Sequence, residues 1–204
     1  MASDDDGNGG TNSKIVYTPS AAGTYTIHCT SYSASAVGAY TVTLAGSGGG
    51  GGGTELLTNG GFDTGSASPW VLATYSSLVT TSPQSGSYCA KMLGRGTTTS
   101  TNFYQAVPGF NGATKTLTFY LKMSSAEGTS TAYDYLYVRL KNTSGTTVST
   151  LATYSNVNNN TYTGWTLVTL TVPASALANY RISFDATEDT SLQTTFYIDS
   201  VSVK

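Results

Sequence analysis

The sequence has little charge, and this shortage excludes several classes of function. Only 10% of its 204 residues are Asp, Glu, Lys or Arg, and the formal net charge at pH 7 is −2. Without a concentration of basic residues, the chain is not expected to bind nucleic acid or an anionic membrane surface. No run of 18 or more apolar residues occurs, so no transmembrane helix is predicted. We therefore expect neither a nucleic-acid partner nor a membrane partner.

Histidine is almost absent, which argues against several kinds of active site. His28 is the only histidine, and no Gly-x-Ser-x-Gly motif is present, so a Ser-His-Asp triad is not predicted. The Cys and His spacing of a zinc site is also missing. A carboxylate pair that hydrolyses glycosides is an alternative, with Glu188 beside Asp185 or Asp134 as candidates. We interpret the chain as non-catalytic, with any catalytic domain outside it.

The chain has only two cysteines, Cys29 and Cys89, and they lie on opposite sides of a glycine-rich run. Cys29 continues an apolar stripe with Tyr25 and Ile27, which indicates a buried strand face. The cysteines are interpreted as two small buried hydrophobic residues. A disulfide that joins the two parts of the chain is the alternative.

Residues 46–53, Gly-Ser followed by six glycines, are predicted to be a flexible linker, because such a run loses too much backbone entropy in regular structure. The linker separates residues 1–45 from residues 54–204. The first part shows alternating patterns over 14–18, 23–30 and 39–44. Three strands are few for an independent domain. We predict a small, incomplete β segment that packs on the second domain or pairs with another chain through residues 14–44.

Residues 54–204 are dominated by strand patterns separated by turns rich in Asn, Gly, Ser and Pro. The predicted strands are 71–81, 87–94, 101–107, 115–123, 133–141, 146–154, 165–172, 180–186 and 195–203. A short turn over 174–178 is the only helical pattern. The fold class is therefore predicted as all-β, an antiparallel jelly-roll sandwich preceded by the incomplete β segment.

The period of two in the strands separates core residues from outward residues. In 133–141, Leu136, Val138 and Leu140 face one way, and Asp134 joins them as a buried carboxylate that needs partners. The same alternation directs the other residues outward. If the strands are neighbours, one face presents Tyr120, Lys122, Tyr135, Tyr137, Arg139, Arg181 and Asp185.

Six of these outward residues form the predicted ligand site: Tyr120, Tyr135, Tyr137, Arg139, Arg181 and Asp185. Sugar rings lie on aromatic rings, while charged side chains meet the hydroxyl groups. The alternative is an ordinary surface or a contact between domains, since tyrosine suits half-exposed strands. Trp70 and Trp165 flank turns and are interpreted as core or rim residues rather than ligand contacts.

Several segments resemble known families. Tyr17-Thr-Pro-Ser-Ala-Ala-Gly-Thr-Tyr-Thr-Ile27 and Gly38-Ala-Tyr-Thr-Val42 resemble the C-terminal half of a bacterial pre-peptidase C-terminal domain. Leu56-Leu-Thr-Asn-Gly-Gly-Phe-Asp63 with Trp70, Ser85-Gly-Ser-Tyr-Cys-Ala90, and Phe196-Tyr-Ile-Asp-Ser-Val-Ser-Val203 resemble carbohydrate-binding modules of the four/nine type and their galactose-binding-like relatives. Residues 125–136 and 184–194 are similar to sandwich domains at the C-termini of secreted bacterial serine peptidases.

The second resemblance implies a structural Ca²⁺ where the first and last strands meet. The matching residues are Asn59, Asp63 and Asp199, and their oxygens are of the kind that Ca²⁺ prefers. The alternative is a plain turn at Asn59 and a hydrogen-bonded strand residue at Asp199.

The resemblances together imply a secreted, extracellular accessory module of a bacterial hydrolase, a peptidase, that binds polysaccharide, glycoprotein or another extracellular substrate. The alternative is a structural or self-assembling extracellular module without a small-molecule ligand.

Overall fold

The computed structural model describes residue 15 and residues 26–29, 54–108, 113–174 and 179–204. The chain divides into two compact units, Met1–Ser47 and Gly48–Lys204. In the first unit, residues 26–29 lie outside any strand and are exposed, so the buried stripe predicted at Ile27 and Cys29 is wrong. The other strand residues predicted in 1–45, and most of the segment 14–44 predicted to pair with another chain, lie outside the described residues.

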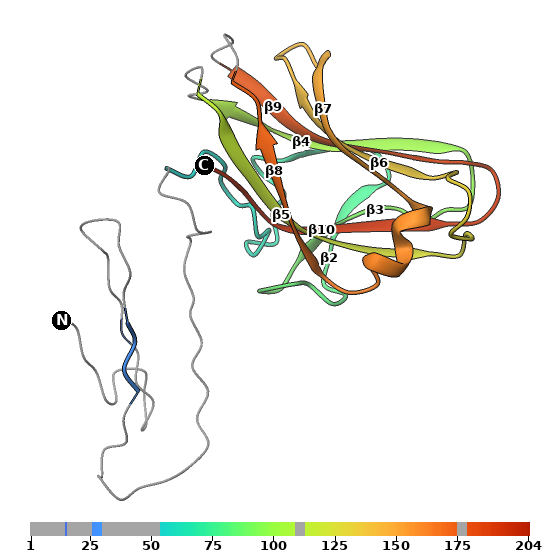
Figure 1. The fold of residues 1–204 in the computed structure, drawn as a ribbon, viewed down its shortest axis with the longest axis horizontal. Helices are drawn as coiled ribbons and strands as arrows, with labels where there is room; N and C mark the ends of the chain where they lie inside the picture. The colour runs from blue at the N-terminus through green and yellow to red at the C-terminus, as the bar shows by residue number, and fades with distance from the viewer. Residues whose placement is uncertain (1–14, 16–25, 30–53, 109–112, 175–178) are drawn as a thin grey trace, which may run out of the picture. The chain divides into compact units, whose positions relative to one another are not determined.

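The second unit is a sandwich of two antiparallel five-stranded sheets, which Figure 1 shows as two layers. The first sheet has the order β1 (Val71–Leu72), β4 (Thr99–Pro108), β9 (Asn179–Glu188), β6 (Tyr135–Lys141) and β7 (Thr147–Ser155). The second has the order β2 (Ser76–Val79), β3 (Cys89–Leu93), β10 (Thr194–Val203), β5 (Lys115–Ser125) and β8 (Thr166–Val172). The predicted all-β antiparallel sandwich is confirmed.

Two local features differ from the predicted elements. The strand predicted over 71–81 is two strands, because the chain turns at Tyr75, whose φ is 72°, and passes from the first sheet to the second. A 3-10 helix, η1 (Asn156–Thr161), follows β7 where a turn is expected. No helix among the described residues is long and apolar enough to cross a membrane.

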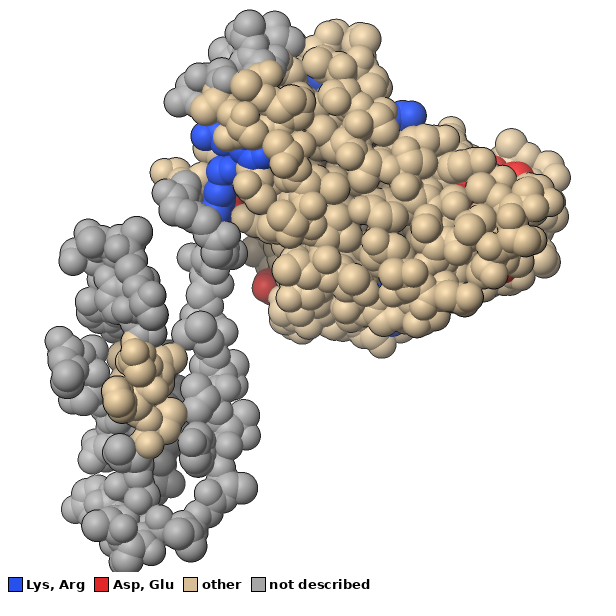
Figure 2. Space-filling view, viewed as in Figure 1, with Lys and Arg blue, Asp and Glu red and all other residues tan. Residues whose placement is uncertain are grey.

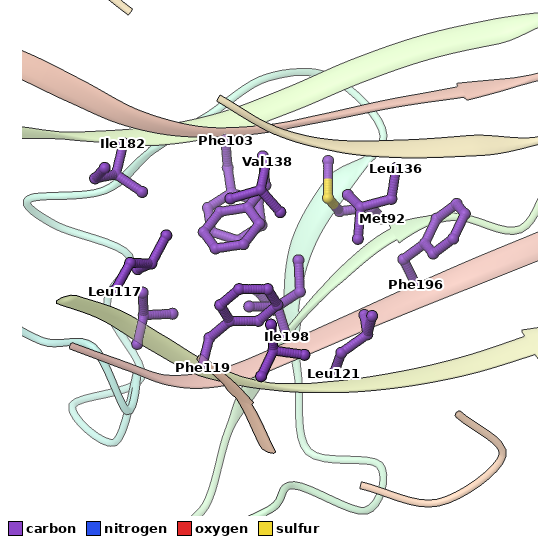
Figure 3. Packing of buried hydrophobic residues seen from close by; sticks show 14 of the residues in the cluster. Met92, Phe103, Leu117, Phe119, Leu121, Leu136, Val138, Ile182, Phe196 and Ile198 are labelled. Atoms are coloured by element: carbon purple, nitrogen blue, oxygen red, sulfur yellow. The ribbon is translucent and has the colours of Figure 1, made fainter. Parts of the chain in front are cut away.

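Aromatic rings fill the middle of the core between the sheets. Figure 3 shows Phe103 of the first sheet facing Phe119 of the second. Phe184 joins the two, with its ring centre 4.8 Å from that of Phe103 and 5.1 Å from that of Phe119. Aliphatic side chains from both sheets surround the rings and are fully buried: Leu117, Leu121, Leu136, Val138, Leu140 and Ile182. The predicted inward faces are therefore confirmed.

The two ends of the second unit lie side by side. The backbone N–H of Leu56 donates to the carbonyl of Val203 at 2.9 Å, and that of Val201 donates to the carbonyl of Gly60 at 2.9 Å. A Cβ atom at Gly60 would lie 1.9 Å from the Val201 carbonyl oxygen, so only glycine fits there. The last strand, β10, lies in the middle of the second sheet, between β3 and β5.

Candidate functional site

The outward side chains of the first sheet form one continuous face. Directly opposed residues of an antiparallel pair project on the same side of a sheet. The register opposes Tyr137 to Asp185, and Arg139 to Ser183. Ser183 is opposed on its other side by Tyr104 of β4. We give the name aromatic face to this surface and define it by eight of its outward residues: Tyr104, Tyr135, Tyr137, Arg139, Lys141, Arg181, Ser183 and Asp185.

Three consecutive outward side chains of β6 stack along the strand. The rings of Tyr135 and Tyr137 are nearly parallel, with 5.8 Å between their centroids and 13° between their planes. The guanidinium carbon of Arg139 lies 4.2 Å from the centre of the Tyr137 ring. All three side chains are half-buried. The stack places two aromatic rings and one cation in a row along the outer side of β6.

Asp185 on β9 holds two cations of β6. Arg139 Nη1 donates to Asp185 Oδ2 at 2.8 Å, and Lys141 Nζ donates to Oδ1 at 2.8 Å. The Ser183 hydroxyl also donates to Oδ1, at 2.7 Å. The Asp185 side chain is only 11% exposed, so leaving this charge unpaired would cost about 3–5 kcal/mol. The cluster therefore fixes the orientation of both cations.

A second pair, formed by Arg181 and Tyr104, extends the face across β9. The guanidinium carbon of Arg181 lies 4.5 Å from the centre of the Tyr104 ring. Arg181 was predicted to face this side, but Tyr104 and Lys141 were missed. The period of two could have identified both residues. Tyr104 follows the inward Phe103, and Lys141 continues the outward series that begins at Tyr135.

Residues 54–200 match the carbohydrate binding domain family CBM_4_9. The chain belongs to this family. No curated protein sequence matches the chain.

Solved structures of other carbohydrate-binding modules have the same fold as this carbohydrate-binding domain. TmCBM61 in complex with β-1,4-galactotriose has a TM-score of 0.56 at 13% identity, over 74% of this chain and 99% of that one. The CBM22-1 xylan-binding domain of Xyn10C from Paenibacillus barcinonensis has a TM-score of 0.51 at 12% identity, over 74% and 94%. A family 16 carbohydrate-binding module-2 has a TM-score of 0.50 at 20% identity, over 73% and 99%. At these identities the similarity concerns the fold alone.

Tyr120 does not lie on the aromatic face of the carbohydrate-binding domain. It belongs to β5 in the second sheet, where it opposes Asp199 of β10, so the expected common face is wrong for Tyr120 and for Lys122. Lys122 Nζ lies 5.5 Å from the centre of the Tyr197 ring on the outer side of that sheet. Alternation gave the correct side of each strand but could not show which strands are neighbours.

The residues predicted to bind calcium are brought together only in part. Asp199 is fully buried, and its Oδ2 accepts the backbone N–H groups of Gln84 at 2.8 Å and Ser85 at 3.3 Å. Asp63 Oδ1 accepts the N–H of Ser87 at 3.0 Å, so both carboxylates face the same loop. The side-chain amide of Asn59 instead donates to the carbonyls of residues 66 and 68. No group of three or more His, Cys, Asp or Glu side chains suited to a metal occurs in the described part of the chain.

The Asp199 carboxylate is buried close to the charge of Asp63. Burial raises the pKa of Asp199 to about 6, and the nearby charge of Asp63 adds to that rise. The three backbone N–H groups of Gln84, Ser85 and Ser200 act in the opposite direction. These N–H donors stabilise the ionised Asp199 carboxylate, which is the effect that a bound cation would also have.

The carboxylates considered for glycoside hydrolysis have structural contacts instead. Glu188 accepts the backbone N–H groups of Arg95, Gly96 and Thr194, each at 3.0 Å. Asp134 Oδ1 accepts the N–H of Asp189 at 2.9 Å. Glu188 and Asp185 are three residues apart in β9 and so project from opposite faces of the sheet. This arrangement does not place Glu188 and Asp185 on either side of one glycosidic bond.

Proposed function

We propose that the aromatic face binds a polysaccharide. The observation that carries the proposal is the parallel pair of rings at Tyr135 and Tyr137, continued by Arg139. The C–H groups of sugar rings pack against the exposed parts of such aromatic side chains, and cation-bearing side chains donate hydrogen bonds to sugar oxygens. Membership of a carbohydrate-binding family supports this use of the face.

A face that spans several strands suits an extended chain better than a single sugar. The aromatic face spans β4, β9 and β6, which are neighbours in the first sheet. Strands in a sheet are about 4.8 Å apart, so three neighbouring strands present roughly 10 Å of surface across their direction. Figure 2 shows that little of the visible surface of the domain is charged, which also suits a hydroxyl-rich partner.

We further propose the biological setting implied by the sequence resemblances. The domain acts as a non-catalytic accessory module of a secreted bacterial hydrolase and holds it on an extracellular polysaccharide or glycoprotein. The attachment to a peptidase rests only on the resemblances of residues 1–45, 125–136 and 184–194. Pairing between chains through residues 14–44 remains the alternative, structural function, and a concentration-independent monomeric mass in solution would remove it.

A structural Ca²⁺ near Asp63 and Asp199 remains a separate proposal. Its support is the proximity of the two carboxylates, whose mutual repulsion a cation would relieve. Asp63 and Asp199 would hold the ion, which would supply only electrostatic stabilisation of the loop at residues 84–87.

Affinity gel electrophoresis tests the main proposal. The purified chain is run through gels that contain β-1,4-galactan, xylan, a soluble cellulose derivative or mucin. We expect at least one of these polymers to retard the protein, and the double variant Tyr135→Ala/Tyr137→Ala to migrate freely. The variant Tyr120→Ala, which removes the same side chain from the second sheet, should be retarded like the natural sequence. Free migration of the unaltered chain in every gel would remove the proposal.

A further inference from the structure

We propose that the aromatic face selects an acidic polysaccharide, with Arg181 and Arg139 contacting the uronate carboxylate or sulfate ester of the ligand. This inference rests on the proposed function of the same face and specifies the chemical class of its ligand. The argument starts from the sign of the charge on the face.

The charge of the face is opposite in sign to that of the whole chain. The charged side chains of the face are Arg139, Lys141, Arg181 and Asp185. Three cations and one anion leave a formal excess of two positive charges, whereas the chain as a whole has a net charge of −2. Lys141 and Arg181 are directly opposed across β6 and β9, which places two cations side by side. Like charges in opposed positions are destabilising, so an anion bound beside them would offset a cost that the free protein carries.

Asp185 cannot compensate all three cations. Its two oxygens accept hydrogen bonds from Arg139, Lys141 and Ser183. No acidic partner of Arg181 occurs among the described residues. Arg139 uses Nη1 on Asp185, and its buried Nε is out of reach of a ligand, so only its remaining Nη hydrogens can be offered outward. Asp185 therefore orients the cations, and guanidinium N–H groups remain for a ligand.

Arg181 is held in place before any ligand arrives. Its guanidinium lies over the Tyr104 ring at 4.5 Å. Its Nη1 also lies close to the turn at Gly145, where a Cβ atom would be 3.4 Å away. A guanidinium held in one position loses less entropy on binding, and its planar fork matches a carboxylate or sulfate group. Each sugar unit of an acidic polymer offers both a C–H face for a tyrosine ring and an anionic group at its edge.

The experiment compares each acidic polymer with a neutral form of the same polymer. Polygalacturonate and alginate are paired with their carboxyl-reduced forms, and a sulfated galactan is paired with its desulfated form. Binding of the full chain is measured by affinity electrophoresis and titration calorimetry. We expect at least one acidic polymer to bind about tenfold more tightly than its neutral partner. The preference should shrink as NaCl is raised from about 50 to about 500 mM, because salt screens exposed charges. The polymer that shows the preference distinguishes carboxylate from sulfate.

Two variants locate the preference on the face. Arg181→Gln should reduce the preference about tenfold, and it should weaken binding to a neutral polymer by a smaller factor. Arg181→Lys keeps the charge but not the fork, and should retain part of the preference. Arg95→Gln is the matched control, since Arg95 also stacks on a tyrosine, 4.2 Å from the centre of the Tyr75 ring, but follows β3 of the second sheet. This control should bind like the natural sequence.

Three outcomes would overturn the inference, and they separate it from the proposed function. Equal binding to the acidic and neutral forms overturns the inference alone and leaves polysaccharide binding in place. A preference that Arg181→Gln does not change, or that Arg95→Gln abolishes, places the anion elsewhere and overturns the inference. Binding to neither form overturns both proposals.

Discussion

The indole N–H of Trp70 donates to the backbone carbonyl of Asn59 at 3.0 Å. This bond joins the turn after residue 59 to the core, because the Trp70 side chain is buried among Phe62, Phe103 and Phe184. Trp70 is therefore a core residue, as expected from its place beside a turn, and not part of a ligand platform.

We expect Trp70→Ala to lower the free energy of unfolding by about 3–5 kcal/mol, since it leaves a large cavity and an unpaired carbonyl. Trp165→Ala is the matched control. Trp165 is only half-buried and donates to the carbonyl of Ser82 at 3.0 Å, so its loss should cost about 1 kcal/mol. Urea unfolding followed by circular dichroism measures both. Equal losses in the two variants would contradict the contrast.

Asp134 should make the stability of the sandwich depend on pH. Burial raises the pKa of this carboxyl above its usual 3.8, and the nearby charges of Glu188 and Asp189 add to the rise, while hydrogen bonds from Thr194 and from the N–H of Asp189 oppose it. The folded protein thus holds the proton more tightly than the unfolded chain. The resulting stabilisation is present below pH 3.8 and is lost as the pH rises through the raised pKa.

The variant Asp134→Asn lacks this titration, so its stability relative to the natural sequence should increase as the pH rises from about 3.5 to 7. Urea unfolding of both proteins at several pH values measures the difference. A difference that is constant or that falls with rising pH would show that the carboxyl of Asp134 has an ordinary or lowered pKa in the fold.

The two cysteines should differ sharply in reactivity. Both thiols are free, Cys29 is exposed, and Cys89 is buried on β3. Burial raises the pKa of the Cys89 thiol to about 11, with a further contribution from the charge of Asp199, so almost no thiolate is present at neutral pH. A thiol reagent should modify one cysteine per chain in the native protein and two in urea. No modification in urea would instead reveal a disulfide between the two residues.

Much of the sandwich was predictable from sequence, because the core imposes a period of two on its strands. Leu136, Val138 and Leu140 are all fully buried, and Tyr135 and Tyr137 face the other side, as the alternation requires. The period does not depend on which strands are neighbours. The alternation could not predict that Tyr120 lies on the second sheet, because this depends on which strands pair. Nor could it predict the bend at Tyr75 between the sheets, which depends on backbone geometry.

In the candidate site, too, the alternation predicts which way a side chain faces but not which residues it contacts. Alternation placed Arg139, Arg181 and Asp185 outward, but their ion-pair cluster depends on the register of β6 against β9. The contacts of Asp63 and Asp199 with the loop at 84–87 likewise join residues more than 20 positions apart in sequence. Such contacts need the folded chain.

Chelation tests the calcium proposal. A bound ion stabilises the folded state by mass action, so EDTA should lower the thermal midpoint by about 5–10 °C if Ca²⁺ is present at a hundredfold excess over its dissociation constant. Added CaCl2 should restore the midpoint, and MgCl2 should not. A midpoint that EDTA leaves unchanged would mean that the backbone N–H groups alone compensate Asp63 and Asp199.

The most direct test of the account is an amide chemical-shift titration of the full chain with oligosaccharides from the polymer that retards it most strongly. We predict that the shifts concentrate on the outward residues of β4, β6 and β9, around Tyr104, Tyr137 and Arg181, and that β3, β5 and β10 change little. Shifts concentrated around Tyr120, Lys122 and Tyr197 on the second sheet would contradict the assignment of the aromatic face as the carbohydrate site.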